Sequence, residues 1–193
     1  KMTLFKKLVV GFLFMNILIV GISFYSVSNL SNMDNSMSVM YDAHLKGVEY
    51  IKTAQANMNA VIRYRNNILL SSDNFQEVES NSKSMNEAIS QFEESLQKFE
   101  ETIVNDEVRK LFDDLTTVWK DFKAKEEKIV ELASKGDFRD ANIERISNRN
   151  LASHMESLID KMVELKAQQS EEANNNSTIT YERTRAITII VCI

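Results

Sequence analysis

Proline is absent from this chain of 193 residues, and no other feature constrains its fold as much. Glycine occurs only 4 times. Because proline and glycine are the residues that most strongly disfavour the interior of an α-helix, almost nothing in the sequence interrupts one. Apolar residues between the two ends of the chain recur at steps of three, four and seven, which is the spacing of a buried helix face. The sequence therefore predicts an all-α fold.

Four segments carry an apolar stripe of this kind, each narrow enough to be buried as one seam against neighbouring helices. Short runs of turn-forming and helix-capping residues separate them at 71–74, 105–106 and 135–137. Because short connections make consecutive helices antiparallel neighbours, we predict an up-down-up-down four-helix bundle, with Trp119 in its core. The stripes are Ile51, Ala54, Met58, Ile62 and Leu69; Val78, Met85, Ile89, Phe92, Leu96, Phe99 and Ile103; Val108, Leu111, Leu115, Val118, Phe122, Ile129 and Leu132; and Leu151, Met155, Leu158, Met162 and Leu165.

The longest apolar segment lies near the N-terminus, at 8–27. A helix of about 20 apolar residues spans a bilayer, and we predict a transmembrane helix here. Lysines among residues 1–7 place that N-terminus in the cytoplasm. A cleaved signal peptide also begins basic and then apolar, but this segment is longer than a signal core and no clear small-residue cleavage site follows it. Residues 184–193 are mostly apolar too, and we interpret them as the truncated start of a second transmembrane helix.

The region between the apolar segments, 28–183, is therefore predicted to be an extracytoplasmic four-helix bundle flanked by transmembrane helices. Its first and last helices extend beyond the middle two toward the membrane. We expect residues 28–44 and 166–183 to form a membrane-proximal stalk. The stalk still carries a thin apolar seam that includes Leu30 and Met33. Such a seam suits pairing with a second copy of the chain, so we predict a homodimer.

Several functions are disfavoured by what the sequence lacks. A net charge of -5 without a basic stripe argues against nucleic acid as a partner. Cys192 is the only cysteine, and neither His44 nor His154 lies in a Glu-x-x-His spacing. We therefore expect no metal site and place both histidines on the surface. There is no phosphate-binding glycine loop, nucleophile elbow or haem-attachment motif, so we expect no catalytic residues, no cofactor and no enzyme activity.

Three segments carry a resemblance to a known family. They are Val-Ile-Arg-Tyr-Arg-Asn-Asn-Ile-Leu-Leu at 61–70, Ala-Ser-Lys-Gly-Asp-Phe at 133–138, and Arg-Thr-Arg at 183–185. Together with the basic and then apolar N-terminus, they make the chain resemble the four-helix-bundle sensor module of bacterial methyl-accepting chemotaxis proteins over essentially its whole length. The chain differs in lacking the proline that relatives often have near Leu45.

This resemblance implies a chemoreceptor in the inner (cytoplasmic) membrane, with its sensor domain outside the cytoplasm. It also implies that a ligand shifts the fourth helix, which passes the signal through the second membrane helix to cytoplasmic signalling partners. The same module precedes histidine kinases and diguanylate cyclases, so the type of output stays open. A membrane-anchored structural coiled coil without a ligand is an alternative from a different class.

One level of the predicted bundle breaks the apolar pattern. Extending the four stripes toward the membrane-distal end brings polar residues inward on every helix. Buried polar groups must be paired or solvated. This level is therefore either a ligand pocket or a network in which Arg65 pairs with Glu126 or Glu144. The inward residues are Arg65, Ser82, Glu126 or its neighbour Lys125, Glu144 and Asn148.

The resemblance favours the pocket, because it implies that related sensors bind small ligands in the membrane-distal half. An arginine suits a carboxylate, and nearby acids suit an amine. We therefore expect the ligand to be a small organic acid or an amino acid. Arg63 lies about 200° around the helix from Arg65 and cannot serve the same pocket. It faces either a ligand at a dimer interface or solvent.

Overall fold

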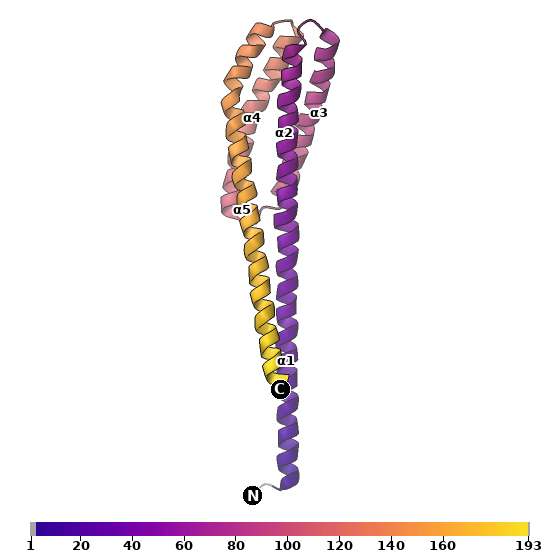
Figure 1. The fold of residues 1–193 in the computed structure, drawn as a ribbon, viewed down its shortest axis with the longest axis vertical. Coiled ribbons are helices and arrows are strands. Elements are labelled where there is room, and N and C mark those ends of the chain that lie inside the picture. Colours follow the sequence, from indigo (N-terminus) through magenta and orange to yellow (C-terminus); the bar gives the residue numbers. More distant parts are fainter. Residues whose placement is uncertain (1–2, 193) are drawn as a thin grey trace. The chain divides into compact units, whose positions relative to one another are not determined.

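The computed structural model describes residues 3–192, which are helical except for short connections (Figure 1). Two compact units are present, one of Lys1–Met40 with Ser170–Ile193 and the other of Tyr41–Gln169. No strand occurs within the described residues, so the predicted all-α fold is confirmed. The helices are α1 (Leu4–Val39), the π-helix η1 (Met40–Leu45), α2 (Lys46–Leu70), α3 (Phe75–Glu100), α4 (Asp106–Ser134) and α5 (Phe138–Cys192).

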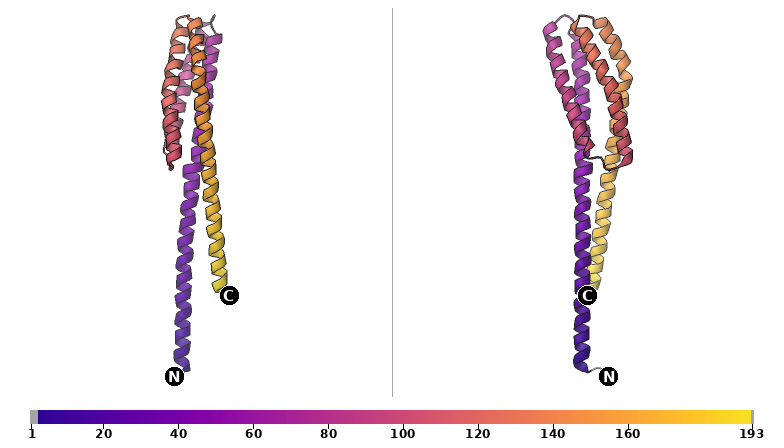
Figure 2. Two further views of the ribbon diagram at one scale, coloured as in Figure 1. Left: turned by 90° about the vertical axis from the view of Figure 1, so that its left-hand side faces the viewer. Right: turned by 180° about the vertical axis from the view of Figure 1, so that it is seen from behind.

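The unit Tyr41–Gln169 is an antiparallel four-helix bundle. In it α2, α3, α4 and the first part of α5 lie side by side, as the views in Figures 1 and 2 show. Each helix runs opposite to the one before it, because the connections at 71–74, 101–105 and 135–137 are short. The predicted up-down-up-down bundle is confirmed.

Capping residues mark the helix boundaries where the sequence predicts them. Asn74 Oδ1 accepts a hydrogen bond from the backbone N–H of Glu77 at 3.3 Å. Asn105 Oδ1 accepts one from the backbone N–H of Glu107 at 2.8 Å. Both side chains satisfy N–H groups that have no partner within the first turn of a helix. Gly136 follows α4 with a φ of 81°, a conformation that suits glycine and ends a helix.

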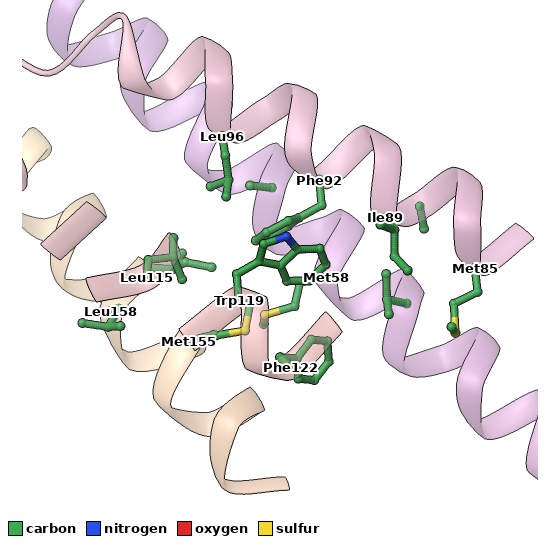
Figure 3. Packing of buried hydrophobic residues seen from close by; sticks show 14 of the residues in the cluster. Met58, Met85, Ile89, Phe92, Leu96, Leu115, Trp119, Phe122, Met155 and Leu158 are labelled. Atoms are coloured by element: carbon green, nitrogen blue, oxygen red, sulfur yellow. The ribbon is translucent and has the colours of Figure 1, made fainter. Parts of the chain in front are cut away.

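Apolar side chains from all four helices fill the bundle, and Figure 3 shows part of this core. The Trp119 ring centroid lies 4.1 Å from that of Phe92 and 5.7 Å from that of Phe122. Met58 of α2 and Met155 of α5 lie beside these rings. The predicted core position of Trp119 is confirmed. Fully burying one large apolar side chain stabilises a fold by about 1.5–3 kcal/mol, so each of these rings contributes substantially to the stability of the bundle.

The buried faces follow the predicted stripes with small shifts. On α2, Ile68 is buried and the predicted Leu69 lies at the edge of the core. On α4, Phe112 is buried and the predicted Leu111 lies at the edge. A straight helix drifts by about 20° per heptad relative to a strict seven-residue repeat. This drift brings the neighbour of a predicted seam residue into the core.

One surface prediction is wrong. His44 is buried, with 5% of its surface exposed, whereas His154 is exposed as predicted. The bundle unit begins at Tyr41, so the packing of its helices already covers the position of His44. The residues that bury His44 are distant in the sequence, so the local sequence around this histidine does not indicate its burial.

The other unit consists of α1 and the C-terminal part of α5. Side chains from both, including Leu30 and Tyr181, line a groove of about 380 Å³. Among the described residues one helix is long and apolar enough to cross a membrane, the continuous helix Leu4–Leu70, and its apolar part lies near the N-terminus. The predicted span 8–27 lies within this helix, and its crossing of a membrane stays a prediction. The second transmembrane helix stays a prediction.

Candidate ligand-binding site

Arg65, Glu126 and Asn148 meet inside the bundle, from α2, α4 and α5. Arg65 Nη1 donates to Oε1 of Glu126 at 2.7 Å, and Nδ2 of Asn148 donates to the same oxygen at 2.8 Å. Arg65 is 6% exposed, and Glu126 and Asn148 are fully buried. The inward placement that the stripes predict for these three residues is confirmed. Their role in ligand binding stays a prediction.

This network leaves buried polar atoms unpaired. Oε2 of Glu126 and Oδ1 of Asn148 have no hydrogen-bond partner within the described part of the chain. Burial raises the pKa of the Glu126 carboxyl, and the charge and hydrogen bond of Arg65 counteract part of that rise. A buried acceptor without a donor costs about 1–3 kcal/mol. The ion pair is therefore formed, but its hydrogen-bonding capacity is not filled.

A cleft of about 170 Å³ opens beside Arg65, between α2 and α5. Arg145 and Arg149, one turn apart on α5, also line it, together with Glu156. Arg145 donates to Oδ1 of Asn142 at 2.8 Å. Neither Arg145 nor Arg149 forms an ion pair with any residue that the structure describes. The remaining lining residues are Met58, Asn59, Ile62, Ala152 and Ser153.

The lining of this cleft is suited to a small anion. It carries three guanidinium groups and one carboxylate, and only the Arg65 guanidinium has an acidic partner among the described residues. Guanidinium groups bind carboxylates through two parallel N–H bonds, which gives both strength and orientation. Met58 and Ile62 add apolar surface, and the carboxylate of Glu156 suits an amine. A small organic acid or an amino acid matches this combination of charges.

The other predicted site residues lie outside this network. Glu144 accepts from Nζ of Lys125 at 3.4 Å, at the half-exposed edge of the bundle. The hydroxyl of Ser82 donates to a carbonyl oxygen of its own helix at 2.6 Å. Arg63 is exposed and lies over the ring of Tyr64. This position agrees with the expectation that Arg63 does not serve the pocket of Arg65.

Arg145 and Arg149 were not among the predicted site residues. The apolar stripe of α5, extended toward the membrane-distal end, reaches Glu144 and Asn148, and each arginine follows one of these residues directly. Because a helix turns by about 100° per residue, the two arginines lie on the flank of that stripe. Their i, i+4 spacing, which places both on one helix face, is the signal by which they were identifiable.

A larger groove, of about 600 Å³, lies between α3 and α4, and several of its polar groups are already engaged. Oε1 of Glu93 accepts from the indole N–H of Trp119 at 3.1 Å and from Nζ of Lys123 at 2.8 Å. Burial alone raises the pKa of Glu93, but the bonds from Lys123 and Trp119 bring it below its ordinary value. The charged side chains of this groove are of both signs, and the described residues that line it include no cluster of guanidinium groups. We therefore place the candidate site at the cleft beside Arg65.

An antiparallel four-helix bundle joined to a long apolar helix, with a charged site inside the bundle, defines a helical module of a membrane protein. Over residues 1–181 the chain matches the family described as the four helix bundle sensory module for signal transduction, and it belongs to that family. The family resemblance given above is confirmed. The family is a sensory one and not a catalytic one. No curated protein and no solved structure matches the chain.

Proposed function

We propose that this chain is the ligand-sensing region of a bacterial transmembrane chemoreceptor, and that the cleft beside Arg65 binds a small organic acid or an amino acid. The observation that carries this proposal is the convergence of three arginines on one cleft. Two of them, Arg145 and Arg149, have no acidic partner among the described residues. A ligand carboxylate would supply one. Membership of a sensory family supports the same role.

In the proposed mechanism the ligand carboxylate competes with Glu126 for Arg65. Glu126 engages Arg65 through a single nitrogen, and the other two nitrogens donate to Oδ1 of the neighbouring Asn66 at 3.3 and 3.4 Å. A second carboxylate would replace these longer, uncharged contacts. A ligand in the cleft contacts Arg65 together with Arg145 and Arg149, and so forms several charge-assisted bonds where there was one. Glu126 then takes up a proton, because a buried carboxylate without its cation is strongly disfavoured.

The signal is proposed to travel along α5. This helix supplies one wall of the cleft and continues without interruption to Cys192. A ligand shifts the balance between two arrangements of α5 only by binding one of them more tightly. Contacts from Arg145 and Arg149 provide such a difference, because they depend on the distance between α5 and α2. We propose that the shift of α5 enters the second membrane helix and reaches cytoplasmic signalling partners.

The proposed receptor lies in the inner membrane with its bundle outside the cytoplasm. The basic residues 1–7 and the apolar part of the helix Leu4–Leu70 support this orientation. We propose a homodimer that pairs through α1. Leu30 and Met37, which follow the predicted span, are exposed apolar side chains in this single chain, and a second copy would cover them.

Three types of cytoplasmic output domain are compatible with this sensor, and the chemoreceptor type is the one we propose. A histidine kinase or a diguanylate cyclase would use the same sensor with a different cytoplasmic domain. In the gene, a downstream coiled-coil hairpin with methylatable Glu and Gln pairs would indicate a chemoreceptor. A structural coiled coil that binds no ligand is a further alternative, and a ligand-binding measurement distinguishes it from a sensor.

A thermal-shift screen of the chain in detergent micelles against organic acids, amino acids and amines tests the ligand proposal. A ligand at about 100 times its Kd stabilises the folded state by about 2.7 kcal/mol, which is readily measured. Arg149→Gln removes one guanidinium of the cleft without breaking an ion pair, and should abolish the shift. Arg139→Gln, at an exposed position on the same helix, is the matched control and should preserve it.

The possible results separate the alternatives. A shift that survives Arg149→Gln would move the site away from this cleft while keeping a sensory role. The absence of a shift with every compound class would reject the proposed ligands and favour the structural coiled coil.

A further inference from the structure

Lys166 is a third charged side chain enclosed by the bundle, besides Arg65 and Glu126, and the proposed ligand site does not involve it. None of its surface is exposed. Its Nζ donates to the carbonyl oxygen of Ala43 at 2.7 Å and to the carbonyl oxygen of Thr102. Ala43 belongs to η1, and Thr102 belongs to the connection between α3 and α4. One ammonium group of α5 therefore joins two other segments of the bundle.

This ammonium group has no acidic partner among the described residues. Its Nζ lies over the Phe99 ring, 5.6 Å from the ring centroid, which is a cation–π contact. A buried charge normally has a counter-ion, because desolvation is costly. Here two carbonyl oxygens and one aromatic ring take the place of a counter-ion. They offset only part of the desolvation free energy, so burial disfavours the protonated form of Lys166.

The backbone around Lys166 is adapted to this contact. η1 is a π-helix, a rare form that is frequent at functional sites. Helices are also distorted where a side chain bonds into their backbone ladder, as Lys166 does at Ala43. At Gly47 an added Cβ would lie 2.8 Å from Oγ1 of Thr102 and 3.2 Å from Cε of Lys166. Only glycine at this position lets the three segments approach so closely.

Electrostatics make the contact sensitive to protons. Burial lowers the pKa of Lys166 to about 8. His44 is the titratable neighbour that interacts with it: burial and the charge of Lys166 lower the pKa of His44, and its Nδ1 has no partner within the described residues. The other charged side chains of the adjoining segments pair elsewhere or are exposed, namely Asp42 with Lys46, Glu100 with Arg109, and Glu101 and Glu164 at the surface.

We propose that Lys166 forms a proton-responsive contact that holds α5 to η1 and to the α3–α4 connection. When Lys166 is neutral, α5 stays docked on the carbonyl oxygens of Ala43 and Thr102. When Lys166 binds a proton, an arrangement in which its side chain reaches water becomes favoured. The neutral amine keeps two N–H donors, enough for both carbonyl oxygens, and does not carry the desolvation cost of the charge. Ambient pH is then a second input to this sensory module, and it stands independently of the proposed ligand.

The direction and size of the effect follow from proton linkage. An exposed lysine binds a proton more tightly than the buried Lys166, so acidification favours the released arrangement. With the pKa at about 8 when docked and at 10.5 when exposed, the ratio of docked to released α5 falls about tenfold from pH 9 to pH 7. The ratio changes mainly above pH 7, because both pKa values lie above 7.

Pulsed electron–electron double resonance, which measures the distance between two spin labels, tests the proposal on the chain in lipid nanodiscs. Spin labels are attached at the exposed positions Glu49→Cys and Ala167→Cys, with Cys192→Ser removing the native thiol. Two distance populations are expected, and their ratio should change about tenfold between pH 7 and pH 9. Lys166→Met should abolish this pH dependence. The matched control Lys161→Met, at an exposed position five residues earlier on α5, should retain it.

A second measurement follows the titration of the unaltered chain, and a variant serves only to assign the resonance. The 13C shift of Cε of Lys166 is followed against pH, with the resonance assigned from the spectrum of Lys166→Arg. A midpoint near pH 8 is expected. A midpoint near 10.5, or a population ratio that changes with pH equally in Lys166→Met, would overturn the proposal.

Discussion

Arg65 holds Glu126 through a single guanidinium nitrogen at 2.7 Å, and the other carboxylate oxygen of Glu126 is buried without a donor among the described residues. Asn148 donates to the oxygen that Arg65 already occupies, so it does not relieve the other one. Two opposite charges are thus kept inside the bundle by one short contact. Each protects the other from the cost of an unpaired buried charge, which makes the pair sensitive to the loss of either member.

The single variant Arg65→Met is expected to destabilise the bundle by about 3–5 kcal/mol, because it leaves the Glu126 carboxylate buried without a cation. The double variant Arg65→Met with Glu126→Leu should recover most of this loss, since neither charge of the pair is then left buried without the other. Urea unfolding followed by the fluorescence of Trp119, the only tryptophan, measures both.

Lys125→Met is the control for this series. It breaks the half-exposed pair with Glu144, for which about 1 kcal/mol or less is expected. A double variant as unstable as Arg65→Met alone would contradict the account of the buried pair.

Gly47→Ala is expected to destabilise the bundle by about 1–3 kcal/mol, because its Cβ would overlap Oγ1 of Thr102. This loss should appear even though alanine favours a helix by up to about 1 kcal/mol. Thermal unfolding followed by circular dichroism measures it. Gly21→Ala has open space around its Cβ and should leave stability unchanged or slightly raised. Equal effects at the two glycines would rule out the close approach at Gly47.

Stability should fall on acidification through His44. Burial and the charge of Lys166 lower the pKa of His44 in the folded state below 6.5. The unfolded chain therefore binds a proton first, and stability is lost as the pH falls from about 6.5 toward the lowered folded-state pKa. His44→Gln should remove this part of the pH dependence of unfolding. The exposed His154→Gln should not, and a similar result for both variants would argue against the buried His44.

Phe92→Ala is expected to cost about 3–5 kcal/mol, because it removes the ring that packs against Trp119 and leaves a cavity. Phe75→Ala changes a ring that is 60% exposed at the start of α3 and should cost about 0.5 kcal/mol or less. Urea midpoints of the two variants give the comparison. If both losses were small, the aromatic cluster would not be a major source of stability.

Ligand binding should be accompanied by proton uptake at Glu126. Its pKa is already raised by burial, and loss of Arg65 to the ligand raises it further. Calorimetric titration of a ligand found in the thermal-shift screen, in two buffers of different ionisation enthalpy, reports the number of protons taken up. Glu126→Gln should bring that number to zero. Uptake that persists in this variant would assign the proton to another group.

Much of the fold was predictable because its signals are local. The absence of proline, the apolar stripes and the caps at Asn74, Asn105 and Gly136 act over a few residues, so they can be identified without knowing which helices pack together. Short connections then leave few ways to arrange four helices. The inward position of Arg65 also follows from its place in a stripe.

The stripes left two possible partners for Arg65, Glu126 and Glu144, and the choice of Glu126 was not predictable because Lys125 and Glu126 are neighbours on α4. A rotation of α4 by one residue, about 100°, exchanges Lys125 for Glu126. Packing of the Phe122 layer sets that rotation, and the sequence shows only which residues are apolar. The cleft and its two additional arginines depend in the same way on how α5 meets α2.

The burial of Lys166 was decided by tertiary structure alone. In the sequence it begins a mostly polar stretch, and nothing near it identifies a partner. Its hydrogen bonds reach carbonyl oxygens of residues 123 and 64 positions away, at Ala43 and Thr102. Local periodicity encodes which face of a helix is apolar. Backbone carbonyl groups are identical at every residue, so a contact made through them leaves no pattern in the sequence and exists only once the chain has folded.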